Sequence, residues 1–196
     1  MAKHPVDDEG RAIPDASWPP GREAPGRLEQ VRRFLNSTNR ENGADHLGDP
    51  IRAARWLNGE GWPVRPDEAQ LSRLRRFRDE LHAAIEARSR HAAPHWPAAM
   101  ATAALTVEST PAGPRLIGAG RGTDRVVNDV LAVVVEAHAG GSLDRLGVCA
   151  HCGWSFYDRS RNSGGQWCSM AACGQREKMR RYRARKRAGA GAGRAR

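Results

Sequence analysis

The sequence predicts a mainly α-helical protein with a small β-hairpin, followed by a compact four-cysteine module and a basic C-terminal helix. Three observations predict this fold class. Apolar residues recur at helical spacing through residues 27–141, all four cysteines lie after residue 148, and so does the whole formal net charge of +10. Residues 1–148 carry 20 basic and 20 acidic residues, so two independent signals coincide in the last 48 residues.

Three amphipathic helices are expected in the first half of the chain. The first begins near Gly26, and its apolar residues lie three and four positions apart: Leu28, Val31 and Leu35. The second opens at Pro50 and stops at Gly59. The third is capped by Asp67 and ends near Arg90. Its apolar face is formed by Leu71, Leu74, Phe77, Leu81 and Ile85.

A hairpin and a central helix follow. Two β-prone runs, 103–108 and 115–118, are separated by proline and glycine and predict a β-hairpin. Thr123 or Asp124 then caps a helix that is apolar around most of its circumference, and Gly140 and Gly141 end it. Such a helix is expected at the centre of the core.

The composition argues against membrane and secreted proteins. The mean hydropathy is −0.67, and 28% of the residues are charged. No run approaches the roughly 20 apolar residues of a membrane-spanning helix, and residues 1–8 lack the apolar region of a secretory signal. We therefore expect a cytoplasmic protein with no membrane partner.

The cysteines have the spacing of a metal site. Cys149 and Cys152 are separated by two residues, and Cys168 and Cys173 by four. Four cysteines in a protein expected to be cytoplasmic indicate a structural Zn²⁺ site with four thiolate ligands. The alternatives are an iron–sulfur cluster or disulfides. His151 lies between two ligands, and a side chain inside such a knuckle is expected to point outward.

The surrounding residues predict a treble-clef-like zinc finger. A hairpin is expected over residues 153–167, with its turn at 162–165. The metal would be covered by four aromatic residues: Trp154, Phe156, Tyr157 and Trp167. A module of about 40 residues has little core, so metal binding, with an apparent energy of about 10–16 kcal/mol in finger peptides, would supply much of its stability.

The helix after Cys173 is strongly basic. At 100° per residue one stripe is formed by Arg176, Arg180, Arg183 and Arg187, and a second stripe by Lys178, Arg181 and Arg185. This pattern favours nucleic acid over an anionic membrane or a solvated tail, because the helix has little apolar surface. The candidate nucleic-acid-binding residues are Gln175, Arg176, Arg180, Arg183, Arg187, Arg159 and Arg161.

Residues 145–174 resemble the CGNR zinc finger, which is named for its last cysteine and the three residues that follow. Here that signature reads Cys173-Gly174-Gln175-Arg176, with glutamine in place of asparagine. Upstream, residues 34–38 and 56–57 resemble the ABATE domain. The resemblance implies a bacterial stress-induced transcription regulator whose N-terminal domain senses a signal, and it brings no catalytic residues.

The expected organisation is a flexible arm over residues 1–26, a helical domain over 27–141, the finger with its basic helix over 145–187, and a flexible tail over 188–196. The partners expected are double-stranded DNA, a small-molecule effector at the N-terminal domain and a second copy of the chain. A pocket there could be lined by Arg40, Asp45, His46 and Trp56, although these are also ordinary surface and cap residues.

Other function classes stay open at this point. An RNA-binding or ribosome-associated zinc protein would use the same basic helix, and an iron–sulfur redox sensor the same cysteines. A treble-clef nuclease would need a catalytic metal set, for which only His151 and Asp158 lie near the finger. We therefore expect a binding protein and not an enzyme.

Overall fold

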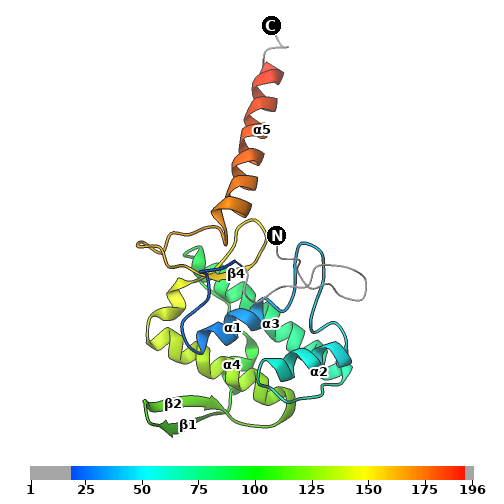
Figure 1. The fold of residues 1–196 in the computed structure, drawn as a ribbon, viewed down its shortest axis with the longest axis vertical. Helices are drawn as coiled ribbons and strands as arrows, with labels where there is room; N and C mark the ends of the chain where they lie inside the picture. Colours follow the sequence, from blue (N-terminus) through cyan, green and yellow to red (C-terminus); the bar gives the residue numbers. More distant parts are fainter. Residues whose placement is uncertain (1–18, 193–196) are drawn as a thin grey trace.

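The computed structural model describes residues 19–192, with side chains as far as Arg187. Four helices and a hairpin form the body, to which a short second hairpin and a long basic helix are attached (Figure 1). The helices are α1 (Leu28–Leu35), α2 (Pro50–Gly59), α3 (Glu68–Ser89), α4 (Gly122–Ala139) and α5 (Gln175–Ala192). The strands are β1 (Leu105–Thr110), β2 (Gly113–Gly118), β3 (Leu146–Val148) and β4 (Ser155–Tyr157). The short helical turns are η1 (Ala98–Thr102), η2 (Ser142–Arg145) and the π-helical η3 (Met170–Gly174). This confirms the predicted fold class.

Side chains cap α2 and α3 at the predicted starts. Asp49 accepts a hydrogen bond of 2.9 Å from the backbone N–H of Arg52, and Pro50 occupies the first helical position. Asp67 and Gln70 form a reciprocal capping box at the start of α3. Both starts are local features of the sequence, which is why they could be predicted.

The start of α4 differs from the prediction. The helix begins at Gly122, and neither Thr123 nor Asp124 caps it. Gly120 and Gly122 have φ angles of +98° and +56°, so the chain turns into the helix before it reaches the expected cap. The end agrees with the prediction, since Gly141 takes the left-handed conformation directly after the helix.

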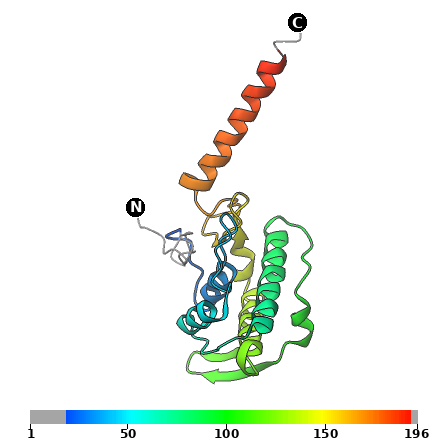
Figure 2. The same cartoon turned by 90° about the vertical axis from the view of Figure 1, so that its right-hand side faces the viewer.

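The core lies between α1, α3 and α4, which pack side by side (Figure 2). As predicted, α4 is buried over much of its circumference, through Val126, Val130, Leu131, Ala132, Val133, Val134 and Ala137. Phe34 of α1 contacts the rings of Phe77 and Trp62, with centroid distances of 5.8 and 6.2 Å. The apolar cluster that forms this core extends into the C-terminal module, where it includes residues of β3 and β4.

The predicted hairpin is formed by β1 and β2, which pair antiparallel with Leu105 opposite Gly118. Gly118 must be glycine, because a Cβ there would lie 2.3 Å from the backbone nitrogen of Asp129 in α4. The hairpin therefore lies close against α4, at the end of the molecule opposite α5 (Figure 1).

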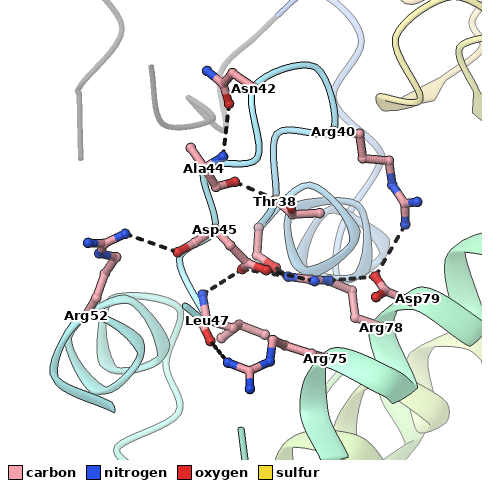
Figure 3. A network of polar contacts seen from close by, with 11 residues as sticks. Thr38, Arg40, Asn42, Ala44, Asp45, Leu47, Arg52, Arg75, Arg78 and Asp79 are labelled. Carbon is pink, nitrogen blue, oxygen red and sulfur yellow. Dashed lines mark hydrogen bonds and ion pairs between the residues drawn. The ribbon is translucent and has the colours of Figure 1, made fainter. Parts of the chain in front are cut away.

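Arginines from α3 hold the loop between α1 and α2 (Figure 3). Arg78, whose side chain is only 3% exposed, donates to the two carboxylate oxygens of Asp45 at 2.7 and 2.9 Å and to Ser37 Oγ at 3.1 Å. Arg75 donates to the backbone carbonyl of Leu47 at 2.9 Å. Burial opposes the charge of Arg78, but its ion pairs with carboxylates outweigh that effect and raise the pKa of the guanidinium.

The residues considered as a pocket lining have structural partners in this region. Arg40 forms an ion pair with Asp79 at 3.3 Å. The rings of His46 and Trp56 stack with a centroid distance of 5.6 Å.

The segment 19–26 is not the flexible arm that its prolines predicted. The backbone carbonyl of Arg22 accepts a hydrogen bond of 2.9 Å from the N–H of Tyr157, and Ala24 is buried in the main core. The prediction was wrong here because the partner lies more than 130 residues further along the chain. The rest of the expected arm, residues 1–18, lies outside the described residues.

The expected flexible tail is also helical where it is described. The helix α5 continues to Ala192, past residue 188, where the tail was expected to begin. Alanine favours helix strongly enough to offset part of the cost of Gly189 and Gly191. Residues 193–196 lie outside the described part of the chain.

We expect Asp45→Ala to lower the free energy of unfolding by about 3–5 kcal/mol, because the charge of Arg78 would stay buried without its partner. Chemical denaturation followed by circular dichroism measures this loss. Arg90→Ala, which breaks the exposed pair with Glu86, is the control and should cost less than about 1 kcal/mol. Equal losses in the two variants would contradict a dominant role for the buried pair.

Candidate metal centre and basic helix

The first two cysteines lie on a knuckle between β3 and β4. The strands pair antiparallel, with Leu146 opposite Tyr157. The N–H of Cys149 donates to the carbonyl of Trp154, and the N–H of Gly153 donates back to the carbonyl of Cys149, both at 2.9 Å. Gly153 has a φ of +73°, which a residue with a side chain rarely adopts. The tight turn therefore depends on this glycine.

The hairpin expected over residues 153–167 is not formed, and the turn expected at residues 162–165 does not join two strands. The partner of β4 is β3, on the other side of the knuckle. The chain after β4 instead folds around the carboxylate of Asp158, which accepts hydrogen bonds from the N–H groups of Ser160 at 2.9 Å and Gly165 at 2.7 Å. The loop is therefore held by hydrogen bonds to the side chain of Asp158, and not by backbone hydrogen bonds between two strands.

The four cysteine sulfur atoms lie within 4.8 Å of one another. Those of Cys152, Cys168 and Cys173 form a triangle with sides of 3.6, 3.7 and 3.7 Å. A tetrahedral site with zinc–sulfur bonds of about 2.3 Å has sulfur–sulfur edges of about 3.8 Å. The donor set therefore has the composition and the dimensions of a four-thiolate metal centre.

The electrostatics of the cluster also favour a cation. Hydrogen bonds from Cys152 and Cys168 hold the pKa of the Cys149 thiol far below its usual range. The same contacts with Cys149 raise the pKa of Cys152 and of Cys168 well above the usual value. A divalent cation bound among the four sulfur atoms would favour their thiolate forms and remove the repulsion between them.

Aromatic residues cover the cluster, largely as predicted. Trp154 and Phe156 are buried in a small core with the cysteines, and Trp167 packs against it. Tyr157 differs, because it faces the main core of the body. Since successive strand residues point to opposite sides, β4 separates the two cores.

The last cysteine anchors the base of α5. Cys173 lies in the π-helical turn η3, which runs directly into the helix. A Cβ at Gly174 would lie 2.8 Å from Sδ of Met170 and 3.3 Å from Cδ1 of Trp167. Glycine at this position of the signature therefore allows the first turn of α5 to pack closely beside the cluster.

The finger is joined to the body by buried hydrogen bonds. Asn36, at the end of α1, donates through Nδ2 to the carbonyl of Ser155 and accepts through Oδ1 from the N–H of Ser155, both at 2.8 Å. Burial lowers the pKa of His82 in α3, and Nε2 of its ring donates to the carbonyl of Gly153 at 2.7 Å. Neither of these two contacts was predicted from the sequence.

The main core also continues into the finger, through Leu146, Val148 and Tyr157. The size of the module predicts little core of its own, with metal binding supplying much of its stability. The structure instead shows a finger that shares apolar burial with the body, because its two strands lie against α1 and α3.

The helix α5 projects from the finger with solvent along most of its length (Figures 1 and 2). The predicted stripe of Arg176, Arg180, Arg183 and Arg187 lies on one face and lines a shallow cleft of about 820 Å³. Gln175 lines the same cleft. His151 of the knuckle lines the same cleft, so it points outward as expected. The second basic stripe lies on another face, which is lined by Lys178, Arg181 and Arg185.

A single acidic residue, Glu177, lies in α5. It is buried and accepts hydrogen bonds from Arg180 at 2.7 Å and from Arg181 at 2.8 Å, which lower its pKa to about 2. Arg176 pairs with Glu41 of the body at 3.3 Å. The remaining positive charge of the helix faces solvent.

The two arginines predicted in the finger loop lie apart from this cleft. Arg159 donates to the carbonyl of Glu23 at 2.9 Å and lies over the ring of Tyr157, 5.5 Å from its centroid. It therefore helps to hold the segment 19–26. Arg161 is exposed in the loop that Asp158 organises.

Comparison with known proteins identifies two families. Residues 16–145 match ABATE, described as "Putative stress-induced transcription regulator", and residues 145–186 match the CGNR zinc finger, so both resemblances are confirmed. A search of curated proteins finds no match to the chain. None of the helices within residues 19–192 combines the length and the apolar character that crossing a membrane requires. The ABATE match covers more than half of the chain and the finger match includes all four cysteines, so the chain belongs to the ABATE family and carries a CGNR zinc finger at its C-terminal end.

Proposed function

We propose that the chain is a DNA-binding transcription regulator in which a zinc-bound finger holds α5 against duplex DNA. One observation carries the proposal: the predicted stripe lies on a single open face of a projecting helix, next to His151 of the knuckle. The description of the ABATE family as regulators supports the same class. In this proposal the protein acts by binding and not by catalysis.

The charge pattern of α5 supports a polyanionic partner. Arg176 and Arg187 are about 16 Å apart along the helix, and the major groove of DNA, about 12 Å wide, admits an α-helix. Like charges four residues apart, as in Arg183 and Arg187, repel each other on a free helix. Phosphates would remove that repulsion, and released counterions would add to the affinity. A membrane is a poorer match, because the described apolar side chains of α5 are limited to Met179, Tyr182 and the small Ala184.

We propose Zn²⁺ as the metal and a structural role for it. Thiolates suit zinc, the four sulfur atoms lie within 4.8 Å of one another, and the CGNR match is to a zinc finger. Bound zinc would hold the knuckle and η3 together, and Cys173 would then fix the direction in which α5 leaves the finger.

We also propose that the ABATE domain transmits a signal to the finger. Asn36 and His82 connect α1 and α3 directly to the backbone around the knuckle. An effector that moved either helix would shift β4 and with it the base of α5. The hydrogen bonds supply the physical connection, and the effector itself is to be found by ligand screening.

Removing the metal should disorder the finger and spare most of the body. Native mass spectrometry is expected to find one zinc per chain, and chelation or Cys168→Ser should release it. The apparent binding energy in finger peptides is about 10–16 kcal/mol, so its loss should disorder the base of α5, while circular dichroism retains the signal of α1, α3 and α4.

Absorbance of protein purified without oxygen provides the control for the metal's identity. A colourless protein fits zinc, whereas visible absorption bands would indicate an iron–sulfur cluster. A metal-free chain with an ordered finger would contradict the proposed centre.

We expect the Arg180→Glu/Arg183→Glu double variant to weaken binding to all DNA sequences alike. If these side chains neutralise two phosphates, the slope of log K against log[salt] should fall by about 1.8. The matched control is Arg181→Glu/Arg185→Glu, which makes the same charge change on the other face. Equal effects of the two pairs would contradict a single binding face, and a preference of the wild type for RNA would favour an RNA-binding protein.

Gln175→Ala should change site preference more than overall affinity. Gln175 lies at the start of α5 in the cleft, where an amide can pair with the edge of a base. Selection of binding sites from random duplexes with each protein measures the preference. Identical selected sites with uniformly weaker binding would assign Gln175 to the phosphate backbone.

A further inference from the structure

We propose that the outer edge of β1 is a dimer interface, at which a second copy of this chain adds its own β1 antiparallel, centred on Val107. The two edges of the β1–β2 hairpin differ in how their backbone groups are satisfied.

The outer edge of β2 is covered by side chains of the body. Both backbone groups of Leu116 are satisfied: its N–H donates to Glu136, and its carbonyl accepts a hydrogen bond of 2.7 Å from Arg27. The N–H of Gly118 donates to Asp129 at 2.9 Å. Carboxylates of α4 thus take the place of a third strand.

The same bonds determine which groups of β1 point outward. Leu116 is opposite Val107, and its backbone groups point away from β1, so this is a pair without ladder hydrogen bonds. By the alternation of an antiparallel ladder, the N–H and C=O groups of Leu105, Val107 and Ser109 point away from β2. Across residues 19–192, no hydrogen bond from another part of the chain reaches these groups.

The edge also lacks the features that usually protect a monomer from pairing. The strand contains no proline, lysine or bulge, and Val107 is 70% exposed. The single charge in β1, Glu108, already pairs with Arg115 across its own hairpin. An open β-strand edge with β-branched residues is a template for another strand.

A second copy fits this edge by symmetry. Two β1 strands related by a two-fold axis at Val107 place Leu105 of each opposite Ser109 of the other, so every outward N–H meets a C=O. Thr106 then lies opposite Glu108, and no like charges face each other directly. The exposed Val107 side chains become neighbours, and the two hairpins form one four-stranded sheet.

This interface would determine the shape of the regulator. β1 is the outermost element at the end of the molecule opposite α5 (Figures 1 and 2). A dimer joined there would carry its basic helices at opposite ends and could hold two separate DNA segments. This consequence rests on the proposed function, whereas the dimer itself does not.

Sedimentation velocity of the full-length, zinc-loaded chain without nucleic acid tests the interface. At about 1–100 µM the wild type is expected to approach twice the chain mass of 21.4 kDa as concentration rises. Val107→Lys and Val107→Glu should each raise the dissociation constant about tenfold or more, because like charges would meet at the axis. A mixture of the two variants should restore the dimer, since lysine then faces glutamate.

Ile51→Lys is the matched control. Ile51 is 75% exposed on α2, and its substitution makes the same change from an apolar to a charged side chain. It should dimerise like the wild type. A monomeric wild type, or a dimer that both Val107 variants leave intact, would overturn the proposal. A dimer that does not bind DNA would keep the interface and remove the proposed function.

Discussion

The arrangement of the functional groups depends on the docking of β4 against the end of α1. The side-chain amide of Asn36 pairs with both backbone groups of Ser155, as a neighbouring strand would. Both residues are buried, so breaking this pair would leave groups unsatisfied at about 1–3 kcal/mol each. Because side chains alternate along a strand, fixing Ser155 directs Phe156 to the metal cluster and Tyr157 to the main core.

Short, closely packed connections fix the position of α5 relative to β4. The knuckle is closed by hydrogen bonds around Gly153, and His82 holds it from the other side. The cysteine cluster then joins the knuckle to η3, and the close packing at Gly174 joins η3 to the helix. Among the described residues few body contacts reach α5, apart from the exposed pair of Arg176 with Glu41, so the cluster determines its direction. A structural metal is effective at this point because it replaces a core that the segment is too short to form.

The sequence was sufficient for features that depend on neighbours along the chain. Helical periodicity, the helix start at Pro50, the cap at Asp67 and the cysteine spacing are of this kind. The structure differed from the prediction where contacts beyond the local sequence pattern determine the conformation. The loop around Asp158 and the segment at Arg22 each depend on contacts that no local pattern reveals. The buried Arg78 and His82 are instructive, because they lie beside the apolar face of α3 at helical spacing, which could have marked them as candidates for burial.

The distribution of charge explains why the net positive charge of so arginine-rich a chain is concentrated after residue 148. In the body, many arginines form ion pairs with carboxylates, as in the buried pair of Arg78 with Asp45 and the pair of Arg27 with Glu136. Residues 1–148 are formally neutral, and their fields largely cancel beyond the Debye length of about 8–10 Å. In α5 only Glu177 offsets the arginines, and it is already shared by Arg180 and Arg181. A polyanion would therefore be drawn to the projecting helix and not to the body, so charge segregation would orient the encounter before any specific contact forms.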